Sequence, residues 1–220
     1  MQELPRRVKC SLVACGKRGA MKIIPMLIKE RTFIDPKDGK TKSRFGYRGH
    51  NAIAWIIVHY TGDRYAQGCA KKTAAAMQTW KRTVSTHYLV GDDGIYQTVA
   101  DRHAAWHCPY EKSNKCAACN SVAIGVDLVE HKRNTRSKSV KDSDWYFTEK
   151  VICDGAELVA MLADKYDIPM DHIVRHYDVT GKWCPRPFVG ADTNDVTGDV
   201  HEIGWKLFKE RVRLARREKR

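Results

Sequence analysis

The chain has 220 residues, of which 43% are hydrophobic and 30% are charged. This composition is typical of a folded globular protein and excludes collagen-like and intrinsically disordered chains. No run of apolar residues approaches the length of a membrane-spanning helix. Charged residues also interrupt the apolar run of the first 20 residues, so we expect no secretory signal.

The formal net charge of +13 is concentrated at the two ends of the chain. Residues 1–50 hold 13 Lys/Arg against 4 Asp/Glu, and residues 206–220 hold 8 against 2. The residues between them are nearly neutral. Basic ends favour polyanionic partners such as nucleic acid, anionic lipid, lipopolysaccharide or teichoic acid, but they also serve as a solvated surface. We therefore divide the chain into a basic extension or lead-in, 1–50, and a domain, 51–220, that ends in a basic helix.

In the first half of the chain, the clearest element is a buried central strand. It is predicted by the continuous apolar and β-branched run 54–60. A short strand precedes it within 22–28, and apolar residues at helical spacing predict a helix over 67–82. Strands over 86–90 and 95–99, joined by a Gly-Asp-Asp-Gly turn, form a predicted hairpin. The irregular stretch 102–120 is long enough to be a functional loop.

The second half repeats this alternation of strands and helices. A second buried strand is predicted over 122–129, followed by a polar loop over 131–144. Thr148 is a suitable N-cap for a helix that ends near Tyr166. A short strand, 172–176, and a loop, 177–183, precede a last helix over 201–217. This mixed order predicts an α/β fold with a single mixed central β-sheet flanked by helices on both faces.

Two histidines and a cysteine form a candidate metal site. His59 stands at the end of the first buried strand, His176 ends a short strand, and Cys184 follows eight residues later. A single strand histidine is most often structural. Two imidazoles and one thiolate, however, suit zinc and leave its fourth position open, as catalytic zinc sites do. The pattern predicts a catalytic zinc ion.

Two further residues are candidates for the chemistry beside the zinc. Asp127 interrupts an apolar strand, where a carboxylate is costly unless it is paired or lies near a metal. It is our candidate general base. Lys182, two residues before Cys184, is the candidate that stabilises an oxyanion. The alternatives are a salt-bridged core aspartate and a solvated loop lysine.

Five segments in the same order resemble zinc-dependent N-acetylmuramoyl-L-alanine amidases. They are WIIVHYTG (55–62), THYLV (86–90), AWH (105–107), 120–127 and RHYDVTGKWCP (175–185). The last is the most specific, and the resemblance covers about residues 50–210. The family shares its fold with animal peptidoglycan recognition proteins and includes phage endolysins. Membership implies hydrolysis of the amide between N-acetylmuramic acid and L-alanine in peptidoglycan.

The resemblance also implies roles for individual residues. His59, His176 and Cys184 match the zinc ligands, and Lys182 matches the residue that stabilises the tetrahedral intermediate. Asp127 stands where the family frequently has Glu, and Glu130 is a less suitable substitute because it lies beyond the strand register. At Thr86 some relatives carry a catalytic tyrosine. Trp106, His107 and Asn120 match positions of the substrate cleft and its loop.

The main functional hypothesis is a phage or prophage endolysin with bacteriolytic, antimicrobial activity. Such an enzyme is made in the host cytoplasm without a signal peptide and acts on the cell wall after release. We expect a monomer that binds peptidoglycan, with anionic wall polymers or lipopolysaccharide held by the basic ends, and no specific nucleic acid. The alternatives are a cytoplasmic muropeptide-recycling amidase and a non-catalytic peptidoglycan-binding module. Cys184 favours an enzyme, because recognition relatives often replace that ligand.

Eight cysteines in a chain of this kind are expected to be reduced thiols or metal ligands rather than a disulfide framework. Cys108, Cys116 and Cys119 are close in sequence, and the last two form a C-x-x-C pair. With a fourth ligand, either Cys69 or a histidine, they are candidates for a second, structural zinc site. Unrelated reduced thiols are the favoured interpretation.

Overall fold

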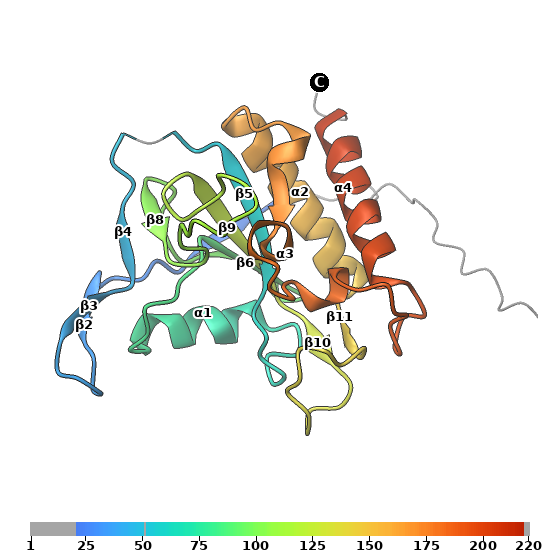
Figure 1. Cartoon of the computed structure of the whole chain (residues 1–220), viewed down its shortest axis with the longest axis horizontal. Helices are drawn as coiled ribbons and strands as arrows, with labels where there is room; N and C mark the ends of the chain where they lie inside the picture. Colours follow the sequence, from blue (N-terminus) through green and yellow to red (C-terminus); the bar gives the residue numbers. More distant parts are fainter. Residues whose placement is uncertain (1–20, 51, 218–220) are drawn as a thin grey trace, which may run out of the picture.

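A computed structural model describes residues 21–50 and 52–217. Its centre is a six-stranded sheet in the order β1-β7-β6-β9-β5-β12 (Figure 1). Strands β6, β9, β5 and β12 run parallel to one another, and β7 runs antiparallel to β6. The elements are β1 (Ile23–Pro25), β2 (Thr32–Ile34), β3 (Thr41–Ser43), β4 (Phe45–Tyr47), β5 (Trp55–Tyr60), α1 (Ala70–Thr79), β6 (Tyr88–Gly91), β7 (Gly94–Gln97), β8 (His103–Ala105), β9 (Ala123–Leu128), β10 (His131–Lys132), β11 (Trp145–Tyr146), α2 (Glu149–Lys165), β12 (Ile173–Arg175), α3 (His176–Thr180) and α4 (His201–Arg217), with 3-10 turns at Met170–His172 and Arg186–Phe188.

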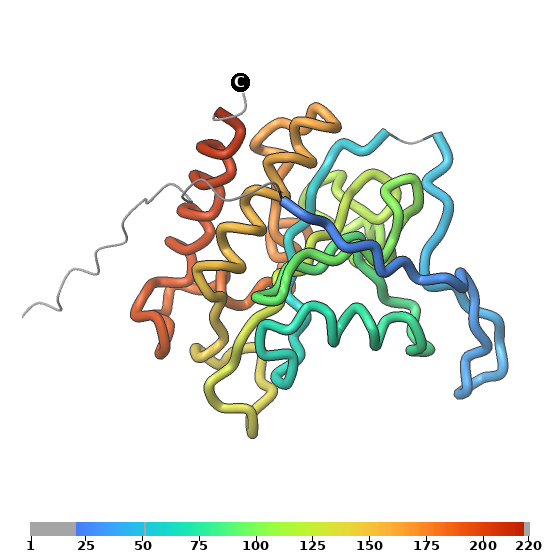
Figure 2. Tube along the Cα trace, turned by 180° about the vertical axis from the view of Figure 1, so that it is seen from behind, coloured from blue at the N-terminus to red at the C-terminus, as the bar shows by residue number. Residues whose placement is uncertain are grey.

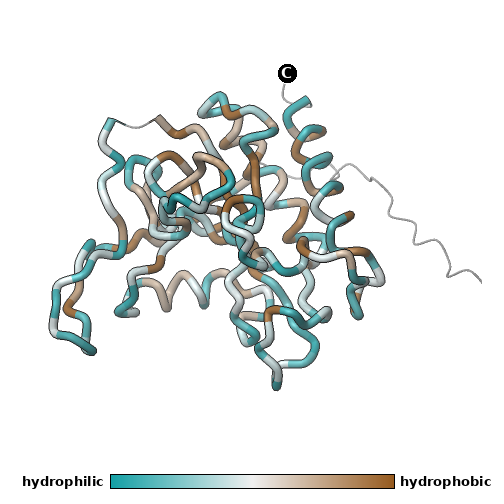
Figure 3. The backbone as a smooth tube through the Cα atoms, viewed as in Figure 1, coloured by the Kyte–Doolittle hydropathy of each residue, from teal (hydrophilic) through white to brown (hydrophobic). Residues whose placement is uncertain are grey.

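The central strands β5 and β9 are buried on both faces, as the apolar runs predict. Alternate residues of a strand point to opposite faces, and Ile56 and Val58 of β5 accordingly belong to the large core cluster beneath α2 and α4. Ile57 belongs to a separate cluster on the other face. His59 shares the face of Ile57, because it lies two residues further along the strand. Figure 3 shows hydrophobic residues concentrated along these central strands.

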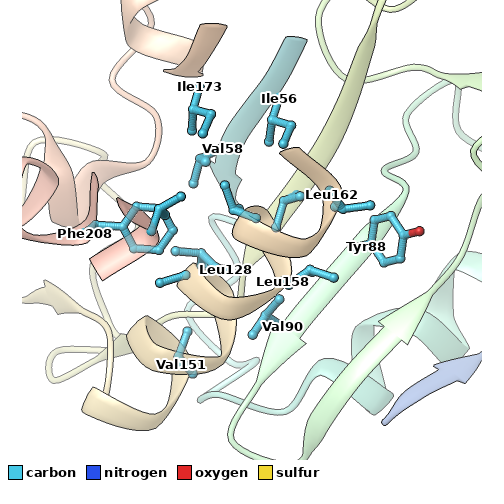
Figure 4. Close-up of a cluster of buried hydrophobic side chains, with 14 of the residues drawn as sticks. Ile56, Val58, Tyr88, Val90, Leu128, Val151, Leu158, Leu162, Ile173 and Phe208 are labelled. Carbon is cyan, nitrogen blue, oxygen red and sulfur yellow. The ribbon is translucent and has the colours of Figure 1, made fainter. Parts of the chain in front are cut away.

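Helices α2 and α4 cover one face of the sheet. Leu158 and Leu162 of α2 lie among the apolar side chains of the sheet, and Phe208 of α4 joins the same cluster (Figure 4). The predicted cap of α2 is confirmed, because the Thr148 hydroxyl accepts a hydrogen bond from the Val151 amide at 3.2 Å. This side of β5 and β9 carries none of the candidate active-site residues, although Cys184 joins the same core cluster.

Helix α1 covers the opposite face, as both views of the chain show (Figures 1 and 2). Ala74 and Met77 pack against Leu89 of β6. The Asp93 carboxylate, from the turn between β6 and β7, accepts hydrogen bonds from the first amides of α1 at 2.8 and 3.0 Å. The hairpin thus caps the helix that packs on it. With helices on both faces, the predicted fold class is confirmed.

The segment 21–48 is closely joined to the rest of the molecule. Strand β1 forms the edge of the central sheet, parallel to β7. The hairpin of β2 and β3 extends away from the sheet (Figure 1). Strand β4 then pairs with β8, which lies in the stretch 102–120 that we predicted as an irregular loop. That stretch is therefore partly ordered as a strand.

Two other sequence predictions need correction. The expected loop 177–183 begins with the short helix α3, which starts at His176 itself. Cys153 is disulfide-bonded, so the expectation of reduced thiols is wrong for this residue. Among the described residues, no helix is long and apolar enough to cross a membrane.

Candidate active site

The three predicted metal ligands lie together. His59 is near the end of β5, and His176 directly follows β12, the parallel neighbour of β5. Their rings are 4.7 Å apart, and Cys184 Sγ lies 3.6 Å from His59 Nδ1. One potential ligand atom from each residue lies within 4.8 Å of the others. Within the described ranges, no other group of three or more His, Cys, Asp or Glu side chains is arranged in this way.

The chemistry of this group fits a zinc ion. All three side chains are buried, and the His176 Nδ1 atom has no hydrogen-bond partner. Burial lowers the pKa of His59 well below its ordinary value and that of His176 to about 4, and the charge of Lys182 acts in the same direction. Burial raises the pKa of the Cys184 thiol. Neutral imidazoles are ready to coordinate, and a divalent cation would stabilise the thiolate that burial disfavours.

Asp127 is the carboxylate that faces the ligands. In the pairing of β9 with β5 it lies directly opposite His59, so the two side chains share one face of the sheet. Its Oδ1 atom is buried and has no hydrogen-bond partner. Burial raises the pKa of Asp127 to about 7, although the Thr86 side chain and the charge of Lys182 lower it. A carboxyl group with this pKa suits proton transfer near neutral pH.

Glu130 has a different role in the structure. Its carboxylate accepts hydrogen bonds from the Thr61 amide at 3.0 Å and the Thr61 hydroxyl at 2.9 Å. Burial raises the pKa of Glu130 to about 8. The side chain thus holds the turn that follows β5, and it is not among the residues that line the cleft.

The ligands open into a cleft of about 530 Å³ that continues along α1. Lys72, Met77 and Trp80 of the α1 region form one side of it. The sequence analysis did not predict that these residues line a cleft. Their helical spacing is a visible signal, but it predicts a packed helix face and does not distinguish a core from a cleft. The lining residues are His59, Tyr60, Thr61, Gly62, Asp63, Lys72, Thr73, Ala76, Met77, Trp80, Arg82, Val84, Ser85, His107, Asp127, His176, Lys182 and Cys184.

Of the three predicted cleft residues, His107 alone lines this space. Its Nδ1 atom lies 3.0 Å from His59 Nε2. The Asn120 side-chain oxygen accepts hydrogen bonds from the amides of His107 and Cys108, at 2.9 and 2.6 Å, and so shapes the loop. Trp106 donates its indole N–H to the Ser43 hydroxyl at 3.2 Å, away from the ligands.

Cys108, Cys116 and Cys119 are free thiols that form no metal-binding group with one another. Cys108 is fully buried, and burial together with the two neighbouring thiols raises its pKa to about 12. A high pKa disfavours the thiolate, which is the form that binds zinc. The described geometry therefore does not show the second zinc site.

Comparison with known proteins identifies relatives of one kind. Residues 49–187 match the family model described as N-acetylmuramoyl-L-alanine amidase. A probable N-acetylmuramoyl-L-alanine amidase of Bacillus licheniformis is 31% identical over 146 residues, which are 63% of this chain and 38% of the relative. The amidase CwlL of the same species is 28% identical over 66% of this chain and 39% of its own length. The chain thus spans about two fifths of these relatives.

Solved structures agree on the fold. PlyL is 21% identical, with a TM-score of 0.58, over 87% of this chain and 97% of its own. The PlyG catalytic domain is 22% identical, with a TM-score of 0.58, over 89% of this chain and 96% of its own. At these identities the likeness concerns the fold.

Proposed function

Because the chain belongs to the N-acetylmuramoyl-L-alanine amidase family, we propose that it hydrolyses the amide between N-acetylmuramic acid and L-alanine in peptidoglycan. The observation that carries this proposal is the buried group of His59, His176 and Cys184 inside a cleft that Asp127 and Lys182 also line. A zinc ion bound there supplies Lewis-acid polarisation of the scissile carbonyl and lowers the pKa of the attacking water.

The chain's own residues provide the proton transfers. Asp127 is proposed to accept the proton of the attacking water and to pass it to the amine of L-alanine as the carbon–nitrogen bond breaks. Its place opposite His59, with a buried Oδ1 atom that has no hydrogen-bond partner, supports this role. Lys182 is proposed to stabilise the negative charge on the carbonyl oxygen in the tetrahedral intermediate. Its place in the cleft, near enough to lower the pKa of both histidine ligands, supports this role.

The substrate is proposed to lie along the cleft beside α1. His107, which lines the cleft, is our candidate for substrate contact. For Asn120 we propose an indirect role through the loop that it shapes. For Trp106 we also propose an indirect role, because its indole binds the Ser43 hydroxyl outside the cleft lining.

The test is digestion of purified sacculi, followed by mass spectrometry of the newly released groups. We expect new L-alanine amino termini and no new reducing sugars. Cys184→Ser should abolish the release, because a hydroxyl is a much poorer zinc ligand than a thiolate. Cys116→Ser is the matched control, since this free thiol lies outside the ligand group. Retention of wall fragments without cleavage by the unaltered protein would instead support a binding module.

A biological role as a phage or prophage endolysin is proposed for the same activity. It predicts lysis of intact sacculi, after release of the enzyme from the host cytoplasm to the wall. A muropeptide-recycling amidase would act on soluble fragments and leave sacculi intact. Comparing the two substrates separates these roles, and size-exclusion chromatography tests the proposed monomer.

The basic ends are proposed to hold anionic wall polymers or lipopolysaccharide. In α4, Arg211, Arg213 and Arg216 pair with acidic side chains, so the polymer would have to compete for part of this charge. Exposed charges are screened over about 10 Å at 0.1 M salt. Lysis should therefore weaken steeply as salt rises, and salt-independent lysis would rule out this tethering.

We propose one zinc ion per chain. Metal analysis of the purified protein measures this number directly. A value of two that falls to one in Cys116→Ser would establish the structural site at Cys108, Cys116 and Cys119, for which the described geometry offers no support.

A further inference from the structure

Arg48 is a buried arginine just outside the part of the chain that matches the family. The match begins at residue 49, and Arg48 belongs to the segment 21–48, which adds the edge strand β1 to the central sheet. Only 4% of the residue is exposed. A buried guanidinium is retained only where its hydrogen-bond donors find partners.

The Arg48 guanidinium is surrounded by backbone carbonyls from both ends of the loop 101–123. It has five N–H donors in a planar fork, and five carbonyl oxygens lie within hydrogen-bond distance. Near the start of the loop the acceptors are Asp101, at 3.1 Å, and His103, at 2.9 Å. Near its end they are Asn120 at 3.4 Å, Ser121 at 2.8 Å and Ala123 at 3.0 Å. One side chain therefore clamps the two ends of the loop together.

The clamped loop carries His107 to the metal ligands. Asn120, whose carbonyl Arg48 contacts, uses its side-chain oxygen to hold the His107 amide. The imidazole of His107 then lies against Gly125, where a Cβ atom would be only 2.8 Å from the ring. Its Nδ1 atom meets His59 Nε2 at 3.0 Å.

The direction of this contact decides which nitrogen of His59 carries the proton and which is free for a metal. A neutral imidazole carries one proton, and the hydrogen bond at one nitrogen selects the tautomer. His59 Nδ1 faces Cys184 Sγ. If His107 Nδ1 accepts this hydrogen bond, the proton of His59 is on Nε2 and its Nδ1 is free for the ligand group; if His107 Nδ1 donates, the proton of His59 is on Nδ1.

We propose that Arg48 is a positioning residue of the metal centre, acting through the loop 101–123 and His107 on the tautomer of His59. The segment 21–48 is then part of the catalytic unit and not an appendage to it. The inference rests on the metal site of the proposed function, but it does not depend on the substrate.

Arg48→Met tests the proposal, with Arg44→Met as the matched control. Arg44 is equally buried and comes from the same segment, but its Nη1 atom donates to the carbonyls of Gln78, at 3.2 Å, and Glu30, at 3.5 Å, outside the loop. Zinc affinity is measured by competition with a chromophoric chelator, and the His59 tautomer by long-range ¹H–¹⁵N NMR of the zinc-free protein. Thermal unfolding of each variant is recorded in parallel.

We expect Arg48→Met to weaken zinc binding about 10- to 100-fold, the range for residues that orient metal ligands, and to give His59 a mixture of tautomers. Arg44→Met should lower the melting temperature but leave zinc affinity within about twofold. An equal loss of zinc affinity in both variants, or none in Arg48→Met, would overturn the proposal.

His107→Ala tests the last contact independently if Arg48→Met does not fold. It leaves the guanidinium clamp in place and removes the hydrogen-bond partner of His59, so the same 10- to 100-fold loss and tautomer mixture are expected. Unchanged zinc affinity in this variant would contradict the proposed route. Because neither measurement uses peptidoglycan, failure of the chain to cleave sacculi would leave the inference standing.

Discussion

Lowering the pH from 7 to 4.5 is expected to destabilise the protein through His87. This residue is fully buried. Its Nδ1 atom accepts a hydrogen bond from the Gly125 amide at 3.0 Å, so Nε2 carries the proton and faces the His103 carbonyl at 3.0 Å. Burial lowers the pKa of His87 to about 4, and the nearby Arg48 charge adds to the effect.

The sign and size of the effect follow from linkage. The unfolded chain binds a proton at His87 near pH 6.5, whereas the native protein does so only near pH 4. The contribution of His87 to the free energy of unfolding is therefore complete above pH 6.5, and it is lost as the pH falls toward 4. At 1.36 kcal/mol per pH unit this interval corresponds to about 3 kcal/mol, most of which is lost by pH 4.5.

Urea denaturation at several pH values, at a fixed zinc concentration, measures this loss. His87→Gln is the reference, because glutamine does not titrate. The titration of His59 and His176 contributes to both proteins and cancels in the difference. The variant should be less stable at pH 7, yet its free energy of unfolding should fall less between pH 7 and 4.5. Parallel pH profiles for the two proteins would refute the assignment.

Three further substitutions test other parts of the structure. Lys182→Met should lower kcat on sacculi about 10²- to 10³-fold, the usual cost of removing an oxyanion stabiliser, with zinc content unchanged; loss of zinc would contradict the assigned role. Gly125→Ala places a Cβ atom 2.8 Å from the His107 ring, so we expect a loss of about 1–3 kcal/mol in urea denaturation together with weaker zinc binding. Thr148→Ala removes the cap of α2 and should lower the free energy of unfolding by about 1 kcal/mol. Activity on sacculi should not change, and a fall in kcat would contradict the separation of this helix from the site.

The central strands and the ligand group could be predicted because their signals are local. The apolar runs of β5 and β9 can only be buried, and Asp127 is conspicuous as the charged residue within one of them. The spacing of His176 and Cys184 marks a turn that returns to the end of β5. In such cases the pattern in a short window is itself the physical cause of the structure.

The role of Arg48 could not be predicted, because its partners, five backbone carbonyls and the ring of His87, lie 39 to 75 residues away. Carbonyl groups are present at every residue, so no residue type in the loop 101–123 signals the contact. The surrounding composition also misleads. Arg48 counts toward the basic charge of residues 1–50, which favours a solvated or polymer-binding surface, yet its side chain is buried. Net charge describes a surface only when the side chains are on it.

On β5 and β9, the residues that pack in the core beneath α2 and the residues that face the candidate site lie on opposite faces of the sheet. On β9, Val126 and Leu128 pack beneath α2, whereas Gly125 and Asp127 point to the ligands and His107. Because the strand period is two residues, a substitution beneath α2 removes buried apolar contacts without touching the cleft. Gly125 affects both stability and chemistry. The His107 ring occupies the space that a side chain at this position would need. The cleft face of β9 is therefore constrained by shape as well as by chemistry, and a larger residue at 125 is expected to displace the His107 ring that contacts the proposed ligand His59.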